Sequence, residues 1–227
     1  MKSLSRPSLD INKPIAFIHV PKCAGSSVRS LVNKEFGKAV LLHYRNEALR
    51  TNPQPITQTY ANDLVKKQGR CIVYGHFNMK RGFGVLDSLP WAEQFITILR
   101  EPFEQFVSAF KYKNRSTPEN INERNFALVL ETVSPNYLNH FPRHVEPNNF
   151  KVEIEKRFNY IGFYENLDNS LKNIWSLLGL TQKPNVPELN TSPATTVNFE
   201  SFRAEFEARN PLEVAVYNYA REVWYDR

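Results

Sequence analysis

The segment Phe17-Ile-His-Val-Pro-Lys-Cys-Ala-Gly-Ser-Ser-Val28 decides the fold of this 227-residue chain. It begins within an apolar, β-branched run over residues 15–20, which is typical of a buried strand. A proline and a glycine then interrupt the pattern, and apolar residues recur at spacings of three and four over residues 26–36. This spacing predicts an amphipathic helix with Ser26 as its N-cap. The segment therefore predicts a strand, a short loop and a helix.

The loop of this segment has the features of an anion-binding site. Backbone N–H groups at the start of a helix have no partner inside the helix, and the helix dipole adds positive potential there. Gly25 lets the backbone approach a ligand closely, and Lys22 places a positive charge at the mouth of the loop. Ser26 and Ser27 supply hydroxyl donors. We therefore expect a cradle for an anion at this loop.

Strand and helix patterns alternate along the rest of the chain. Further short apolar runs, most of them predicted strands, lie at residues 39–42, 71–74, 94–99 and 160–163. Helices are expected at residues 60–67, from residue 102 onward, and at 125–132, 152–157, 167–178, 199–208 and 212–225. This alternation predicts an α/β fold, a P-loop-like parallel β-sheet flanked by helices on both faces. We expect one domain over residues 1–227, with a loose leader at 1–14.

Composition limits the classes of function. The chain is 41% hydrophobic and 23% charged, as globular proteins are, and its net charge of +6 favours an anionic ligand. Its two cysteines exclude a disulfide framework. No apolar run approaches the length of about 18–20 residues that spans a membrane, and the N-terminus lacks an apolar signal core. A cytoplasmic protein is expected, and the alternative is a soluble fragment of a membrane-anchored lumenal enzyme.

The stretch Val20-Pro-Lys-Cys-Ala-Gly-Ser-Ser27 resembles the 5′-phosphosulfate loop of the carbohydrate sulfotransferases, P-K-x-x-G-[ST]-[ST]. The related family includes the heparan sulfate 2-O-sulfotransferases and the chondroitin sulfotransferases. The resemblance implies that 3′-phosphoadenylyl sulfate (PAPS) is the donor. It also implies that the donor is bound by Lys22, Cys23, Ala24, Gly25, Ser26 and Ser27.

A second motif, Ile98-Leu-Arg-Glu-Pro-Phe-Glu-Gln-Phe-Val-Ser108, follows the clearest predicted strand. In the family, an arginine at this point is followed by an acid, a proline and, eight residues after the arginine, a serine. The resemblance implies that Arg100 and Ser108 bind the 3′-phosphate of the nucleotide. A guanidinium at the carboxyl end of a strand suits a phosphate. Weaker similarity extends over residues 15–225 and includes Leu189-Asn-Thr-Ser192, which resembles a loop near the nucleotide.

Sulfuryl transfer to a hydroxyl needs a base for the hydroxyl proton and positive charge beside the leaving phosphate. His76 follows the predicted strand over residues 71–74 and is the candidate base, because a pKa of about 6.5 suits proton removal near neutral pH. Lys22 is the candidate for the positive charge beside the leaving phosphate. The heparan sulfate 2-O branch has His-Gly-His where this chain has Tyr74-Gly-His76. His19 is expected to be a core residue inside a strand, whereas His43 could approach the site.

The expected function is transfer of a sulfuryl group from PAPS to a hydroxyl of a carbohydrate or glycoconjugate. The transfer would be in-line and metal-independent, with 3′-phosphoadenosine 5′-phosphate (PAP) as product. A candidate groove for an acidic glycan comprises Lys80, Arg81, Lys111, Lys113, Arg115 and Arg143. Two alternatives stay open: a non-enzymatic module that binds anionic glycans or nucleotides, and a kinase-like nucleotide enzyme. The kinase is disfavoured because the pattern G-x-x-x-x-G-K-[ST] is absent, and no nucleic-acid-binding module is recognisable.

Overall fold

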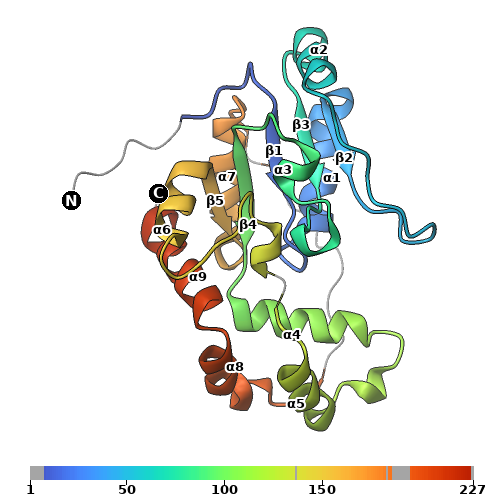
Figure 1. The fold of residues 1–227 in the computed structure, drawn as a ribbon, viewed down its shortest axis with the longest axis vertical. Coiled ribbons are helices and arrows are strands. Elements are labelled where there is room, and N and C mark those ends of the chain that lie inside the picture. The colour runs from blue at the N-terminus through green and yellow to red at the C-terminus, as the bar shows by residue number, and fades with distance from the viewer. Residues whose placement is uncertain (1–7, 136, 183, 186–194, 226–227) are drawn as a thin grey trace.

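The computed structural model describes residues 8–135, 137–182, 184–185 and 195–225 (Figure 1). In this part of the chain, five parallel strands form one sheet in the order β2-β3-β1-β4-β5. The strands are β1 (Ile15–Ile18), β2 (Val40–His43), β3 (Ile72–Gly75), β4 (Phe95–Leu99) and β5 (Phe158–Phe163). The predicted α/β fold with a parallel sheet is confirmed.

Helices cover both faces of this sheet, with α1 and α7 behind the strands and α3 in front of them in Figure 1. The helices of the described residues are α1 (Gly25–Phe36), α2 (Gln58–Gln68), α3 (Val85–Ser88), α4 (Pro102–Lys113), α5 (Glu123–Thr132), α6 (Phe150–Arg157), α7 (Leu167–Leu177), α8 (Arg203–Arg209) and α9 (Pro211–Trp224). All but α3, a single turn between β3 and β4, fall on predicted segments. None of the helices in this part of the chain has both the length and the hydropathy that crossing a bilayer requires.

Four of the five strands in the described sheet are mostly apolar because both of their faces are covered. Every residue of β1, β3, β4 and β5 is buried, which explains why the sequence shows continuous apolar runs rather than alternation. In the central register Phe17 pairs with Tyr74 on one side and with Ile96 on the other. Strands β3 and β2 lie on one side of β1, and β4 and β5 on the other. Ligands bind at such a switch in strand order, at the carboxyl ends of the strands.

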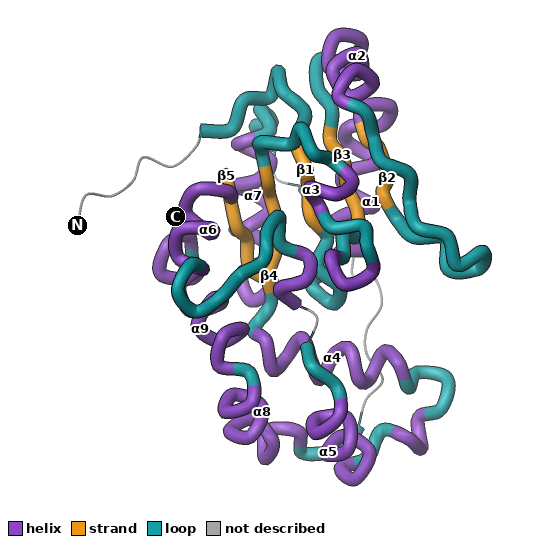
Figure 2. Tube along the Cα trace, in the orientation of Figure 1, coloured by secondary structure: helices purple, strands orange, loops and turns teal. Residues whose placement is uncertain are grey.

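The carboxyl ends of the strands all face α4 (Figure 2). His19, His76 and Arg100 directly follow β1, β3 and β4, and β2 ends at His43. Residues that are far apart in the sequence therefore meet at one edge of the sheet. This edge is the place to look for a functional site.

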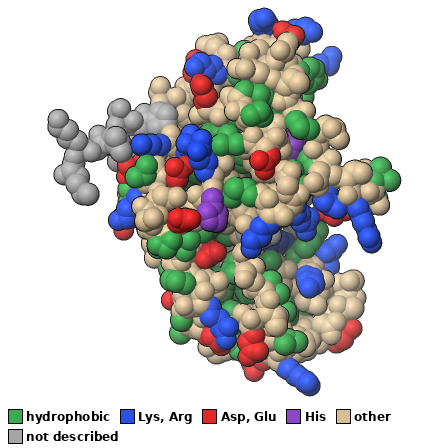
Figure 3. All heavy atoms as spheres, viewed as in Figure 1, with side chains coloured by type: hydrophobic (Ala, Val, Ile, Leu, Met, Phe, Trp, Pro, Cys, Tyr) green, Lys and Arg blue, Asp and Glu red, His purple; other side chains and the backbone are tan. Residues whose placement is uncertain are grey.

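A second apolar cluster lies beyond this edge, where α4, α5 and α8 form a helical lobe (Figure 1). Its rings pack edge to face, with centroids 5.6 Å apart for Phe103 and Phe206 and 5.7 Å apart for Phe106 and Phe126. The α4 residues that enter this cluster are Phe103, Phe106, Val107 and Phe110, all of them buried. Figure 3 shows a hollow between the sheet and this lobe, with lysine and arginine side chains on its rim.

Candidate functional site

The loop between β1 and α1 has the backbone geometry of an anion cradle. Lys22 and Ala24 have φ angles of 67° and 61°, a region that residues other than glycine seldom adopt. Such strain is typical of functional sites. The first helical hydrogen bond runs from Val28 N–H to the Ala24 carbonyl at 3.0 Å. The N–H groups of residues 25–27 therefore lack an intrahelical partner and are available to a ligand.

The prediction that Ser26 is the N-cap is wrong. Ala24 occupies the cap position in a left-handed conformation, and no side chain caps α1. Ser26 lies inside the first helical turn and is exposed, whereas Ser27 is buried. The cap lies two residues earlier than predicted, and the start of the helix is left without a side-chain cap, so its N–H groups can bind a ligand.

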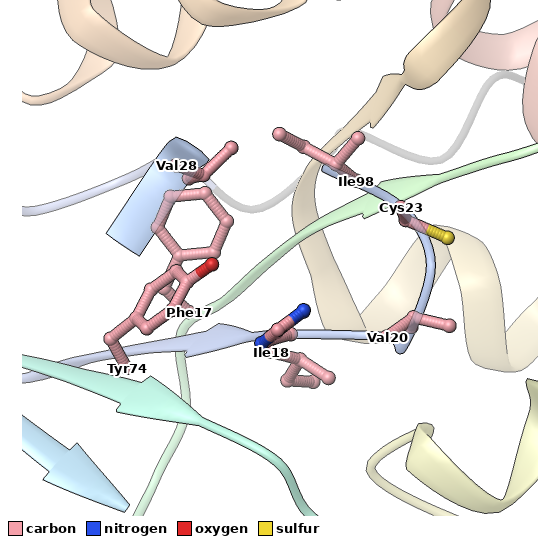
Figure 4. Close-up of a pocket in the computed structure, with 8 residues that line it drawn as sticks. Phe17, Ile18, Val20, Cys23, Val28, Tyr74 and Ile98 are labelled. Carbon is pink, nitrogen blue, oxygen red and sulfur yellow. The ribbon is translucent and has the colours of Figure 1, made fainter. Parts of the chain in front are cut away.

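Two side chains from distant elements fix the loop. The Gln105 amide on α4 donates to the Pro21 carbonyl at 2.9 Å, and the Tyr74 hydroxyl on β3 donates to the Gly25 carbonyl at 2.8 Å. The Cys23 side chain lines a narrow pocket beneath the loop, where burial raises the pKa of its thiol (Figure 4). Cys23 can therefore offer a ligand only its backbone N–H.

A close contact with His19, which the sequence did not suggest, requires glycine at position 25. A Cβ atom at this position would lie 1.5 Å from Nε2 of His19. The imidazole of His19 therefore rests directly against the Gly25 backbone. The prediction that His19 is a core residue inside a strand is wrong: β1 ends at Ile18, and His19 is only half-buried at the mouth of the loop.

Positive charge gathers at the loop. Lys22 Nζ lies 4.0 Å from the centre of the Tyr112 ring, and Arg115 lies at the same distance from that ring. Burial, followed by the charges of Arg100 and Arg115, lowers the pKa of Lys22. The Arg100 guanidinium stacks 4.3 Å from the Tyr164 ring centre, and its buried Nε has no hydrogen-bond partner. Arg100 pairs with Glu104 on α4, its Nη2 atom 3.5 Å from the carboxylate, so Nε is the donor of this guanidinium that is left for an anion.

One face of α4 is directed at the loop. Gln105, Ser108 and Tyr112 follow one another at spacings of three and four, so they share a helix face. Because Gln105 and Tyr112 both contact the loop, the buried Ser108 between them lies on the same side. Glu101 caps the start of α4 by accepting from two backbone N–H groups at 3.1 and 2.9 Å. This cap fixes the backbone that carries Arg100, the residue before it.

Three histidines lie in a row at the carboxyl edge. The ring of His76 lies 4.1 Å from that of His19 and 6.0 Å from that of His140, centroid to centroid. Burial, and then the charges of Arg29 and Arg81, lower the pKa of His76 to about 4. His76 is therefore neutral at pH 7, but it is a weaker base than the ordinary pKa of about 6.5 would make it. Across the described residues, no three His, Cys, Asp or Glu side chains are arranged to hold a metal ion.

The other histidines and the residues of the candidate groove lie at different places in the structure. His140 is in a 3-10 turn (Tyr137–His140) and is 2% exposed. His43 is buried and stacks on Phe77, with Nδ1 3.3 Å from the His76 carbonyl, so it supports the site from within the core. Of the six residues of the candidate groove, Arg81 lies near His76 and Arg115 near Lys22. Leu189-Asn-Thr-Ser192 lies outside the described residues.

Residues 9–212 match the Sulfotransferase family. The chain belongs to the sulfotransferase family. Among solved structures it is similar to a sulfotransferase from Alicyclobacillus acidocaldarius, at 15% identity and a TM-score of 0.48, covering 93% of this chain and 95% of that one. It is also similar to a mouse sulfotransferase in complex with PAP, at 16% identity and a TM-score of 0.43, covering 88% of this chain and 63% of the mouse chain. None of the curated proteins compared with this sequence matches it.

In this sulfotransferase-family protein, Gly25→Ala is expected to lower the free energy of unfolding by about 1–3 kcal/mol, because the new methyl group displaces the His19 ring. The same displacement should weaken anion binding at the loop. Chemical denaturation and calorimetry with PAP measure the two effects. The control is Ser26→Ala, which should change stability by less than about 0.5 kcal/mol because Ser26 caps nothing. A Gly25→Ala variant as stable as the wild type would contradict the close approach of His19.

The protein is expected to lose stability in mild acid. Burial lowers the pKa of His140 to about 3, whereas the unfolded chain titrates near the ordinary value of 6.5. Below pH 6.5 the unfolded chain therefore binds protons that the folded chain excludes, and stability falls as pH falls. For His140 alone the loss is about 2 kcal/mol between pH 7 and pH 5. Urea unfolding at both pH values measures it, and His140→Gln should show a smaller difference; an equal difference would exclude His140 as a cause.

Proposed function

We propose that this protein transfers a sulfuryl group from PAPS to a hydroxyl of a carbohydrate or glycoconjugate. One juxtaposition carries the proposal: the unpaired N–H groups of residues 25–27 and Lys22 lie on the same sheet edge as Arg100 and the neutral His76. The loop N–H groups and Lys22 suit a 5′-phosphosulfate, and Arg100 suits a separate phosphate. Membership of the sulfotransferase family supports the same assignment.

The donor is proposed to bind at two points. The loop N–H groups and Lys22 hold the 5′-phosphosulfate, and Arg100 and Ser108 hold the 3′-phosphate. The unpartnered Nε of Arg100 and the α4 face that places Ser108 toward the loop support this arrangement. When bound, PAPS supplies an activated sulfuryl group whose departure leaves PAP.

The side chains at the edge provide the remaining chemistry. His76 accepts the proton of the acceptor hydroxyl while the acceptor oxygen forms its bond to sulfur. The bond from sulfur to the bridging phosphate oxygen breaks, and its electron pair stays on that oxygen, where Lys22 offsets the growing charge. The products are a sulfate ester, PAP and protonated His76, which releases its proton to water.

The experiment is transfer of radiolabelled sulfur from PAPS to a panel of neutral and acidic glycans. Label in a glycan band, dependent on both Lys22 and His76, is the expected result. PAP binding with no transfer to any hydroxyl would favour the binding module instead. Transfer of phosphate from ATP with Mg²⁺ would favour the kinase-like enzyme.

A further inference from the structure

His19 lies at the mouth of the loop with no role in the reaction described above. The residue is partly buried and keeps some exposed surface. The Nδ1 atom lies 3.0 Å from the Tyr44 hydroxyl oxygen. The Nε2 corner lies against Gly25, whose N–H is one of the unpaired donors of the cradle. An anion held by the Gly25 N–H therefore lies next to Nε2.

The hydroxyl of Tyr44 can select which nitrogen of His19 carries the proton. Arg29 lies 5.5 Å from the centre of the Tyr44 ring, and a guanidinium can donate to the Tyr44 oxygen but cannot accept from it. The Tyr44 proton is therefore available to Nδ1 of His19, 3.0 Å from the hydroxyl oxygen. A neutral ring that accepts this hydrogen bond at Nδ1 carries its own hydrogen on Nε2, the nitrogen beside Gly25.

Burial, more than the surrounding groups, keeps this ring neutral. Burial comes first, and the neighbouring His76 and His140, together with Arg29 and Lys22, all lower the pKa of His19. A neutral imidazole that donates from Nε2 can stabilise negative charge without competing for the proton that His76 removes. The two histidines, 4.1 Å apart, are thus suited to opposite tasks.

We propose that His19 is a second catalytic residue, a role that rests on the proposed function. His19 donates its Nε2–H to a sulfuryl oxygen of PAPS during transfer. Tyr44 is its positioning residue, because the hydroxyl of Tyr44 fixes the tautomer. No bond to His19 forms or breaks. The donated hydrogen bond strengthens as the sulfuryl group moves from the phosphate oxygen to the acceptor oxygen.

Two substitutions with amide side chains test the Nε2–H donor separately from the other contacts of the His19 ring. Gln at position 19 reaches the place of Nε2 and keeps a donor there, whereas Asn reaches only the place of Nδ1. Both side chains are smaller than histidine and leave room beside Gly25. The readouts are Kd for PAPS, Kd for PAP, and kcat for transfer to the acceptor found with labelled PAPS. PAP lacks the sulfuryl group and serves as the matched ligand.

His19→Asn is expected to weaken PAPS binding about tenfold and to lower kcat about 10²-fold, with PAP binding unchanged. His19→Gln should recover most of both losses, and Tyr44→Phe should lower kcat by a smaller factor. Equal losses in the Gln and Asn variants, or an equal loss of PAP affinity, would assign His19 a structural role and overturn the proposal. A wild-type protein that binds neither nucleotide would overturn the proposed function itself, which is a distinguishable result.

Discussion

Replacing His76 with alanine is expected to lower kcat for sulfuryl transfer by about 10²–10⁴-fold, while the Kd for PAP stays unchanged. The acceptor hydroxyl loses its proton as it attacks, and His76 is the half-buried, neutral imidazole at the end of β3 that can take it. The two side chains that hydrogen-bond the loop, Gln105 and Tyr74, do not depend on His76. The loss should therefore appear in the chemical step, which steady-state kinetics at saturating PAPS would show.

His144→Ala is the matched control, because the side chain of this histidine is 79% exposed and pairs with Glu146, away from the sheet edge. It should leave kcat unchanged. The pH profile gives a second test: a base with a pKa of about 4 stays neutral across neutral pH, so the rate should be flat there and fall only toward pH 4. A His76→Ala variant with full kcat, or a rate that falls through pH 6.5, would contradict this role.

Lys22→Ala is expected to lower kcat by about 10²–10³-fold and to weaken PAP binding as well. Lys22 is the cation at the mouth of the loop, and its ammonium group lies over the ring of Tyr112, a residue of α4. Its charge offsets that of the leaving phosphate, where negative charge grows during transfer. Loss of the side chain therefore affects both the bound product and the transition state.

The matched control for this substitution is Lys34→Ala, an exposed lysine in the last turn of α1, at the far end of the helix from the loop. Both variants lose one positive charge, so a general effect of net charge would lower the two rates alike. A Lys34→Ala variant as impaired as Lys22→Ala would show that the loop lysine has no specific role.

The sequence predicted the local parts of the site because each depends on nearby residues. The apolar run before Pro21 and the spacing after Gly25 suffice for a strand, a loop and a helix, and Arg100 directly follows a strand. Parallel strands then bring the ends of β1, β3 and β4 together by topology. The positions of Lys22, Arg100 and His76 at one edge follow from these two facts.

The parts that were missed depend on contacts between distant segments. Gln105 reaches Pro21 and Tyr74 reaches Gly25, and no periodicity in the sequence encodes either contact. His19 was assigned to the core because it lies in an apolar run, although the strand ends one residue before it. Its contact with Gly25 depends on how closely the loop folds back over β1, which local propensity does not determine.

The most direct test of the central claim is calorimetric titration with PAP and with adenosine 5′-phosphate, on the wild type and on Arg100→Ala. The two nucleotides differ only in the 3′-phosphate that Arg100 is proposed to bind. The wild type should bind PAP at least about tenfold more tightly, since a charged hydrogen bond contributes about 1.5–3 kcal/mol, and Arg100→Ala should bind the two alike. Equal affinities in the wild type, or no binding of PAP at millimolar concentration, would contradict a PAPS-dependent sulfotransferase.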